Sequence, residues 1–163
     1  MTPEETLLAL LKEHARAMRR IAWAYAGAAG EEEDLFQEIL TQAWRSLPTF
    51  RGNSAAGTWL YRVALNTALT WKRRTSKHRI GHAELDSSQN GSEPRSHGSP
   101  RSEQAILMDF LGTLGGPDYS ILLLYMEGLS YEEIADVTGL TESAVGVRIH
   151  RMKKTFSERY IEG

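Results

Sequence analysis

A stretch near the middle of the chain cannot take part in a packed core, and it divides the sequence into two halves. Residues 86–101 contain no aliphatic or aromatic residue and consist largely of Ser, Gly, Pro, Asn and Gln. Such a composition buries too little apolar surface to offset the entropy of ordering, so it behaves as a flexible linker. We therefore predict two domains, at residues 1–80 and 102–163, joined by a flexible linker at residues 81–101.

The first half carries the pattern of three helices. Thr2-Pro3-Glu4-Glu5 is a helix start, with an N-cap threonine, a proline and two acids at the positive end of the helix dipole. Gly27 and Gly30 separate this helix from a second one that ends at Pro48, and a third is predicted from about residue 58 to residue 74 or beyond. Helical spacing gives the first helix this apolar face: Leu7, Leu8, Leu11, Ala15, Met18, Ile21, Ala22 and Tyr25.

The second half predicts four more helices. Helical patterns cover about residues 102–114 and 118–127, and Ser130-Tyr131-Glu132-Glu133 is a capping box that opens a short helix ending at Gly139. Thr141 caps a last helix that runs to about Tyr160. Strand patterns are nearly absent from both halves. The expected fold class is all-α, with two small helical domains and a flexible linker between them.

The charge distribution is uneven along the first half. No acid occurs between Ile39 and Ala83, although the whole chain has 21 Asp and Glu against 19 Lys and Arg. Cations neutralise phosphates and aromatic faces stack on unpaired bases, so the tract indicates nucleic-acid binding. The alternative is a solvated basic surface over a core that holds the tryptophans. The basic and aromatic residues are Arg45, Arg51, Arg62, Lys72, Arg73, Arg74, Lys77, Arg79, Trp44, Trp59, Trp71, Phe50 and Tyr61.

A helical wheel divides the third helix of this half into two faces. Tyr61, Ala64, Leu65, Ala68 and Leu69 form a predicted core face. A second stripe is expected to be exposed, and it carries hydrogen-bond donors with one aromatic residue: Trp59, Arg62, Asn66, Thr70 and Arg73.

Residues 130–154 have the pattern of a helix-turn-helix. Ala135 is small enough for a second helix to approach, and Gly139 permits a tight turn. The last helix has an apolar side and, opposite to it, a basic side, which are called its back and its front. No acid occurs between Ser143 and Ser157. Such a helix suits the major groove of duplex DNA, whereas the alternative is an ordinary amphipathic helix pair. The back comprises Val145, Ile149, Met152 and Phe156, and the front comprises Ser143, Val147, His150, Arg151 and Lys154, with Arg148 on the flank.

Several classes of protein are disfavoured. The chain has no cysteine, which excludes disulfides, thiolate metal sites and cysteine nucleophiles. No apolar run approaches the roughly 20 residues that span a membrane, and the acidic N-terminus lacks a signal-peptide pattern. The five histidines show no metal-ligand spacing, and no nucleophile–base set or phosphate loop is present. We expect a cytoplasmic protein that is not an enzyme and needs no cofactor or metal.

Taken together, the two halves resemble the bacterial sigma factors of the extracytoplasmic-function (ECF) group, in the sigma-70 family. Segments 34–38, 44–47, 50–52 and 58–66 (DLFQE, WRSL, FRG and TWLYRVALN) are similar to the family's region two. Segments 127–135, 139–141, 144–145 and 148–151 (EGLSYEEIA, GLT, AV and RIHR) are similar to its region four. The resemblance implies a subunit that binds core RNA polymerase, recognises promoter DNA as duplex and as single strand, and opens the strands. An anti-sigma factor is a further partner that the resemblance implies.

The resemblance also implies roles for individual residues. Asp34, Leu35, Gln37 and Glu38 would contact the polymerase. Phe50, Arg51, Asn53, Ser54, Trp59, Arg62, Asn66 and Arg73 would bind the minus-ten element, with a flipped base in the loop 50–54. Thr141, Ser143, Ala144, Val147, Arg148, His150, Arg151 and Lys154 would read the minus-thirty-five element.

Three positions depart from the family pattern. Thr70 stands where the family usually has an acid, Tyr119 where an arginine is common, and Gly146 where a lysine is frequent. The runner-up interpretation is a stand-alone transcriptional regulator that binds duplex DNA through its helix-turn-helix, which leaves the basic tract unexplained. A helical enzyme is a third interpretation, for which the sequence offers no catalytic set.

Overall fold

The structure is a computed structural model that describes residues 2–27, 30–50, 55–80 and 102–162, with the side chains of residues 76–80 left out. Over these ranges every regular element is a helix, so the all-α prediction is confirmed. The linker predicted at residues 81–101 lies outside the described residues.

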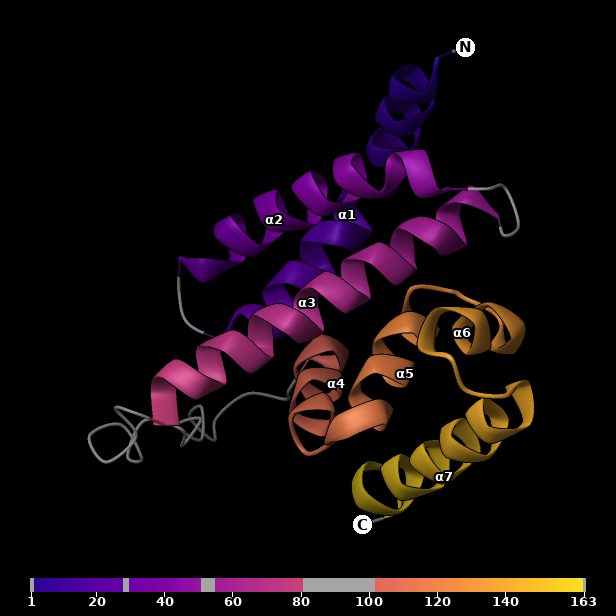
Figure 1. Cartoon of the computed structure of the whole chain (residues 1–163). Coiled ribbons are helices and arrows are strands. Elements are labelled where there is room, and N and C mark those ends of the chain that lie inside the picture. The colour runs from indigo at the N-terminus through magenta and orange to yellow at the C-terminus, as the bar shows by residue number, and fades with distance from the viewer. Residues whose placement is uncertain (1, 28–29, 51–54, 81–101, 163) are drawn as a thin grey trace.

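The first half forms a bundle of three long helices (Figure 1). These are α1 (Pro3–Ala26), α2 (Glu31–Ser46) and α3 (Ala56–Ile80), with the short 3₁₀-helix η1 (Leu47–Thr49) after α2. The predicted start of α1 is confirmed, because the Thr2 hydroxyl accepts from the Glu5 N–H at 3.1 Å and the Glu5 carboxylate accepts from the Thr2 N–H at 2.9 Å. α3 begins two residues earlier than predicted and continues beyond Arg74.

Each helix of this bundle packs on the other two. Met18, Ile21, Leu35, Ile39 and Leu60 are among its fully buried side chains. The apolar face predicted for α1 is wrong at one position, because Leu8 is 57% exposed. Its neighbour Leu7 is 2% exposed. Consecutive residues of an α-helix point about 100° apart, and here Leu7 faces the bundle while Leu8 points to solvent.

The second half contains α4 (Glu103–Gly112), α5 (Gly116–Met126), α6 (Tyr131–Thr138) and α7 (Glu142–Tyr160). The capping box at Ser130 is present, and Gly139 ends α6 with a left-handed backbone at φ 81°. Thr141 caps α7, its hydroxyl accepting from the Ala144 N–H at 3.1 Å. The helix-turn-helix boundaries predicted from the sequence are therefore confirmed.

The two halves pack against each other, and the buried side chains form one continuous cluster. α6 lies on α3, as Figure 1 also shows. Between α1 and α5, the Tyr25 hydroxyl is hydrogen-bonded to the Ser120 hydroxyl at 2.7 Å, and the Tyr119 hydroxyl donates to the Ala24 carbonyl at 2.6 Å. This packing decides which of the predicted functional faces are open to solvent.

Candidate nucleic-acid interface

The front of α7 is open. Ser143, Val147, His150, Arg151 and Lys154 are all exposed, as predicted. Their exposure follows from the opposite face, where Val145, Ile149 and Met152 are buried against the rest of the domain. This surface combines cations, hydroxyls and the 47%-exposed Val147, which are the groups that read base edges and phosphates in a major groove.

Three other residues predicted for this site are placed differently. Thr141 is the N-cap, so its hydroxyl already accepts a hydrogen bond. Ala144 is half-buried. Arg148 donates from Nη1 to Asp118 Oδ1 on α5 at 3.0 Å, and so braces the last helix against its own domain. Their contact with promoter DNA stays a prediction.

Gly146, on the same helix, faces α6. A Cβ built there would lie 3.5 and 3.6 Å from two ring carbons of Tyr131, which is ordinary van der Waals contact. The glycine is therefore not required by close packing.

α3 presents only part of the predicted stripe. Asn66 and Arg73 are exposed, and Arg73 Nη2 donates to the Thr70 hydroxyl at 3.4 Å. Thr70 stands where the family usually has an acid, and its hydroxyl accepts this hydrogen bond from Arg73. Arg62 is half-buried and is held by α6.

The prediction that Trp59 is exposed is wrong, because its side chain is only 7% exposed. The ring of Phe50, which follows η1, packs on it with centroids 5.1 Å apart. The helical wheel could not show this cover, since it comes from another part of the chain. Arg51, Asn53 and Ser54, the rest of the predicted base pocket, lie outside the described residues.

The polymerase-contacting face predicted on α2 needs one correction as well. Leu35 is 0% exposed and belongs to the core, so its side chain cannot contact a partner. Asp34 and Gln37 are exposed, and Glu38 is half-buried, accepting from Gln42 Nε2 at 2.9 Å.

Sequence reasoning missed Trp44 as a surface residue of α2. Its side chain is 55% exposed. It lies seven residues after Gln37, two helical turns along the same face. The helical spacing was the signal that could have found it, because the core positions Ile39 and Ala43 leave Trp44 pointing outward.

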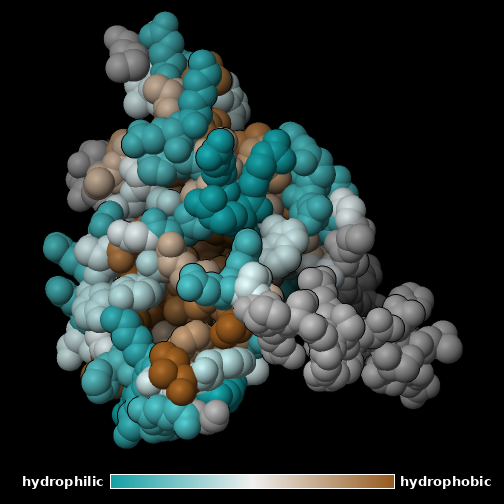
Figure 2. Space-filling view, turned by 180° about the vertical axis from the view of Figure 1, so that it is seen from behind, coloured by the Kyte–Doolittle hydropathy of each residue, from teal (hydrophilic) through white to brown (hydrophobic). Residues whose placement is uncertain are grey.

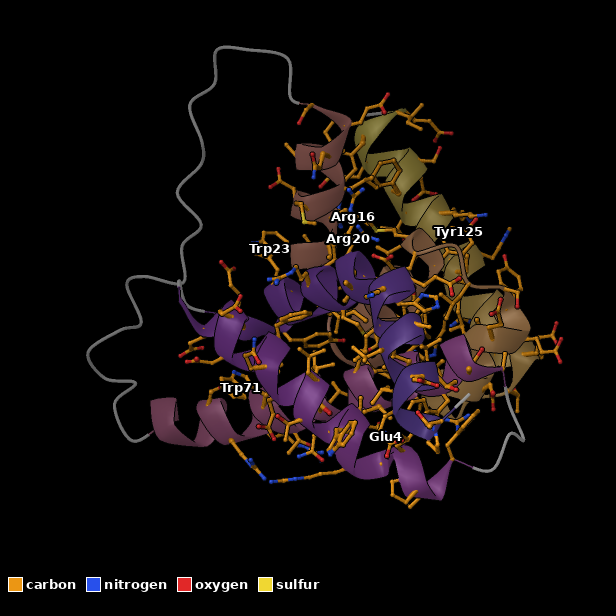
Figure 3. The ribbon with its side chains drawn as sticks, turned by 90° about the horizontal axis from the view of Figure 1, so that it is seen from above. Glu4, Arg16, Arg20, Trp23, Trp71 and Tyr125 are labelled. Atoms are coloured by element: carbon orange, nitrogen blue, oxygen red, sulfur yellow. The ribbon has the colours of Figure 1, made fainter. Side chains whose placement is uncertain are left out.

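A pocket lies between α2 and α3, beside the exposed Asn66. It is lined by Glu38, Gln42, Ser46, Val63, Asn66, Thr67, Thr70, Trp71 and Arg74. The indole N–H of Trp71 is buried there, and it has no hydrogen-bond partner among the residues that the structure describes. Figure 3 shows Trp71 on α3, away from the helices of the second half.

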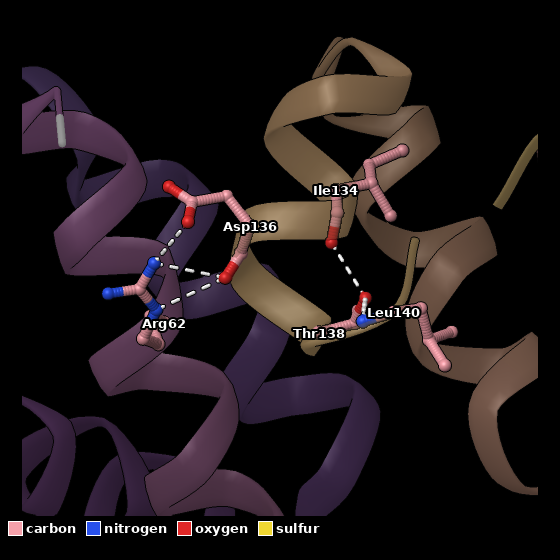
Figure 4. Close-up of polar contacts among 5 residues, drawn as sticks. All are labelled: Arg62, Ile134, Asp136, Thr138 and Leu140. Carbon is pink, nitrogen blue, oxygen red and sulfur yellow. Dashed lines mark hydrogen bonds and ion pairs between the residues drawn. The ribbon is translucent and has the colours of Figure 1, made fainter. Parts of the chain in front are cut away.

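Two arginines connect the halves. Arg62 donates from Nε and Nη2 to the Asp136 carbonyl at 3.2 and 3.0 Å, and from Nη2 to Asp136 Oδ1 at 2.7 Å (Figure 4). Arg20 donates from Nε and Nη2 to the two carboxylate oxygens of Glu127. These hydrogen bonds raise the pKa of Arg20. In Figure 3, Arg20 lies on the side of α1 that faces the second half.

In the parts of the chain that the structure describes, no group of His, Asp and Glu could hold a metal ion. None of the described helices has both the length and the apolar character to cross a membrane. Hydrophilic side chains cover most of the face in Figure 2, with hydrophobic ones gathered in its hollowed middle.

The fold and the two basic helices define a helical nucleic-acid-binding protein, and comparisons with known proteins narrow this class. Residues 10–78 match the family model of Sigma-70 region 2, and residues 104–156 match Sigma-70, region 4. The ECF RNA polymerase sigma-E factor of Escherichia coli (strain K12) is 31% identical over 142 residues, which cover 80% of this chain and 74% of that protein. The RNA polymerase sigma factor YlaC of Bacillus subtilis (strain 168) is 33% identical over 125 residues, covering 74% and 72%.

Two solved structures share the fold. CnrH, in complex with the cytosolic domain of CnrY, gives a TM-score of 0.67 at 22% identity and covers 95% of this chain and 87% of that one. RpoE, in complex with the anti-sigma factor NepR from Bartonella quintana, gives 0.62 at 23%, covering 95% and 94%. The chain belongs to the ECF sigma factors of the sigma-70 family. It is a sigma factor for transcription initiation, so the alternative of a stand-alone regulator is set aside.

Proposed function

We propose that this sigma factor reads the upstream promoter element with the front of α7. The observation that carries the proposal is the set of five exposed side chains at 143, 147, 150, 151 and 154, with no acid in the segment 143–157. An arginine can donate two hydrogen bonds to a guanine edge, and a valine can contact a thymine methyl group. Arg151 and Val147 are therefore the residues to which we assign base discrimination.

We assign binding of the downstream promoter element, the minus-ten element, to α3 and the residues before it. Asn66 and Arg73 offer donors to a strand that has left the duplex. Melting costs a few kcal/mol per unstacked base, and contacts between the protein and the separated strand must offset this cost. The packed Phe50–Trp59 pair would then support the start of α3, rather than act as a free stacking platform.

We assign the contact with core polymerase to the exposed face of α2. Asp34 and Gln37 are joined there by Trp44, an aromatic side chain of the kind that often anchors protein interfaces. Leu35 is excluded from this contact and instead fixes the position of the helix.

Three further assignments rest on the family. We propose a cytoplasmic location and no catalytic residues in this chain, because the polymerase carries out the chemistry. An anti-sigma factor is a proposed partner, since the RpoE structure of the same fold contains the anti-sigma factor NepR.

Run-off transcription with purified core polymerase and genomic fragments tests the proposal. We expect initiation at a subset of fragments, and an Arg151→Ala variant that has lost preference for one upstream sequence. Arg159→Ala is the matched control, because Arg159 lies near the end of the same helix and donates to Thr113 at 3.2 Å. No initiation from any fragment, despite binding to duplex DNA, would contradict the role; unchanged preference in Arg151→Ala would contradict the groove assignment.

A further inference from the structure

His14 is a polar side chain in the seam where α1 packs on α3. The side chain is 21% exposed, whereas Ala17 and Met18 on the next turn of α1 are buried. Its ring lies edge-on to the ring of Tyr61 on α3, with centroids 5.6 Å apart and an angle of 71° between the planes. Tyr61 is itself only 7% exposed. His14 therefore packs on α3 as part of the bundle instead of extending into water.

The same ring occupies the space beside Gly57, one turn before Tyr61 on α3. A Cβ built on Gly57 would lie 3.1 Å from His14 Nε2 and 3.5 Å from Cε1. The shorter of these distances is tighter than ordinary van der Waals contact. Glycine destabilises a helix relative to alanine, and here it leaves room for the imidazole. Gly57 and Tyr61 thus form a notch on α3 that His14 fills.

The start of α3 depends on such packing, because its own sequence stabilises it weakly. The helix begins at Ala56, so the residue at the N-cap position is Ala55, whose side chain has no hydrogen-bond acceptor. The first turn also has no acid to complement the positive end of the helix dipole. Helical stability in proteins comes mostly from tertiary packing. The contact with His14 supplies such packing at the first turn.

The position of this first turn matters for the function proposed for α3. Trp59 comes two residues after Gly57, and the ring of Phe50 packs on it with centroids 5.1 Å apart. Asn66 and Arg73, which we assign to the open strand, follow on the same helix. Displacement of the first turn would therefore move the Phe50–Trp59 pair relative to the rest of the surface assigned to the minus-ten element.

We propose that His14 is a positioning residue for strand opening. By filling the notch on α3, its ring fixes the first turn of that helix and so holds the minus-ten-binding surface in the geometry that the open strand requires. The residue acts through Gly57 and Tyr61 and makes no contact with DNA. The inference rests on the function proposed for α3. It adds α1 to the elements that determine how well the strands are opened.

The test measures strand opening by holoenzyme assembled from core polymerase and the full-length protein. The probe is a promoter that the run-off assay identifies, with 2-aminopurine in the minus-ten element of its non-template strand. Varying the holoenzyme concentration separates promoter binding, given by the half-saturating concentration, from the maximal opening rate. For His14→Ala we expect the maximal rate to fall about tenfold, within the range of coupling between residues in contact, at an unchanged half-saturating concentration. A role in stability alone would leave the maximal rate of the folded holoenzyme unchanged.

Gly57→Ala tests whether the two residues act through each other. In the wild-type background the added methyl group should push the His14 ring aside and lower the maximal opening rate. In the His14→Ala background the same methyl group fills part of the vacated space, so it should raise the rate. Gly112→Ala is the matched control, because a Cβ on this helical glycine of α4 would meet nothing within 4 Å. Should circular dichroism show that His14→Ala does not fold, His14→Gln takes its place in both comparisons.

The outcomes separate the inference from the proposed function. An unchanged maximal opening rate in His14→Ala would overturn the inference alone. Equal losses from Gly57→Ala in both backgrounds would overturn it too, because the two residues would then act independently. An equal loss in Gly112→Ala would have the same meaning, since any added methyl group would then suffice. Absence of run-off initiation by the wild type would instead contradict the function proposed for the whole chain.

Discussion

At the scale of single residues, the four tryptophans show how strongly surroundings decide a role. Trp59 and Trp44 are identical side chains in the same acid-free tract, yet one is 7% exposed and the other 55%. Phe50 covers the first, whereas the second projects from α2. Removing each therefore has a different physical consequence.

We expect Trp59→Ala to lower the free energy of unfolding by about 3–5 kcal/mol, because the truncation leaves a cavity in a packed core. Trp44→Ala should change it by less than about 0.5 kcal/mol, as is usual at exposed sites. Urea denaturation followed by far-UV circular dichroism measures both. Similar losses in the two variants would show that Trp59 is not a core residue.

The buried phenol of Tyr25 should make the free energy of unfolding depend on pH in the alkaline range. Burial raises the pKa of its phenol to about 12, and the hydrogen bond with Ser120 only partly opposes this. The unfolded phenol ionises near pH 10. The folded state therefore favours the neutral phenol, and this contribution is fully present below about pH 10 and is lost as pH rises toward 12.

Urea unfolding at about pH 9 and about pH 11 should show this loss, and Tyr25→Phe should show a smaller loss than the wild type. Tyr131→Phe is the control, because that ring is exposed on α6. Burial likewise raises the pKa of Tyr61 to about 12, so some loss should remain in Tyr25→Phe. An unchanged pH dependence in Tyr25→Phe would contradict the assignment.

At the scale of elements, the helix-turn-helix contains one position that needs a glycine and one that does not. Gly139 ends α6 at φ 81°, a left-handed conformation that a side chain disfavours. Gly146 lies within α7, where Tyr131 leaves room for a methyl group.

Gly146→Ala should therefore raise the free energy of unfolding by up to about 1 kcal/mol, because alanine loses less entropy in a helix. Gly139→Ala should lower it by about 1–2 kcal/mol, because an L-residue is strained in the left-handed region. Thermal and urea unfolding of the free protein measure both. If Gly146→Ala were the more destabilising change, the prediction that Tyr131 leaves room for a methyl group at Gly146 would be wrong.

At the scale of the whole molecule, the continuous buried cluster predicts one unfolding transition. All four tryptophans lie in residues 1–80, so their fluorescence reports on the first half alone, whereas circular dichroism follows every helix. The two signals should give the same midpoint. Leu124→Ala, in the buried part of α5, should lower the fluorescence midpoint although no tryptophan is in that half. Separate midpoints would show that the halves unfold independently.

Local patterns determined much of this molecule. Thr2, Ser130 and Thr141 cap helices where the sequence places them, because capping depends on neighbours three residues away. The basic front of α7 could be predicted too, since residues on one helix face are fixed by the 100° repeat. The same repeat could not show that Trp59 is covered, because what covers a helix face comes from elsewhere in the chain.

The sequence by itself thus determined the helices, their caps and the family to which the chain belongs. The tertiary structure decided which faces remain open. Arg62 is the clearest case: its position predicts a contact with DNA, yet Asp136, 74 residues later in the chain, occupies two of its donors. Helix formation is governed by short-range spacing, whereas exposure depends on long-range packing of α6 on α3, which no local pattern encodes.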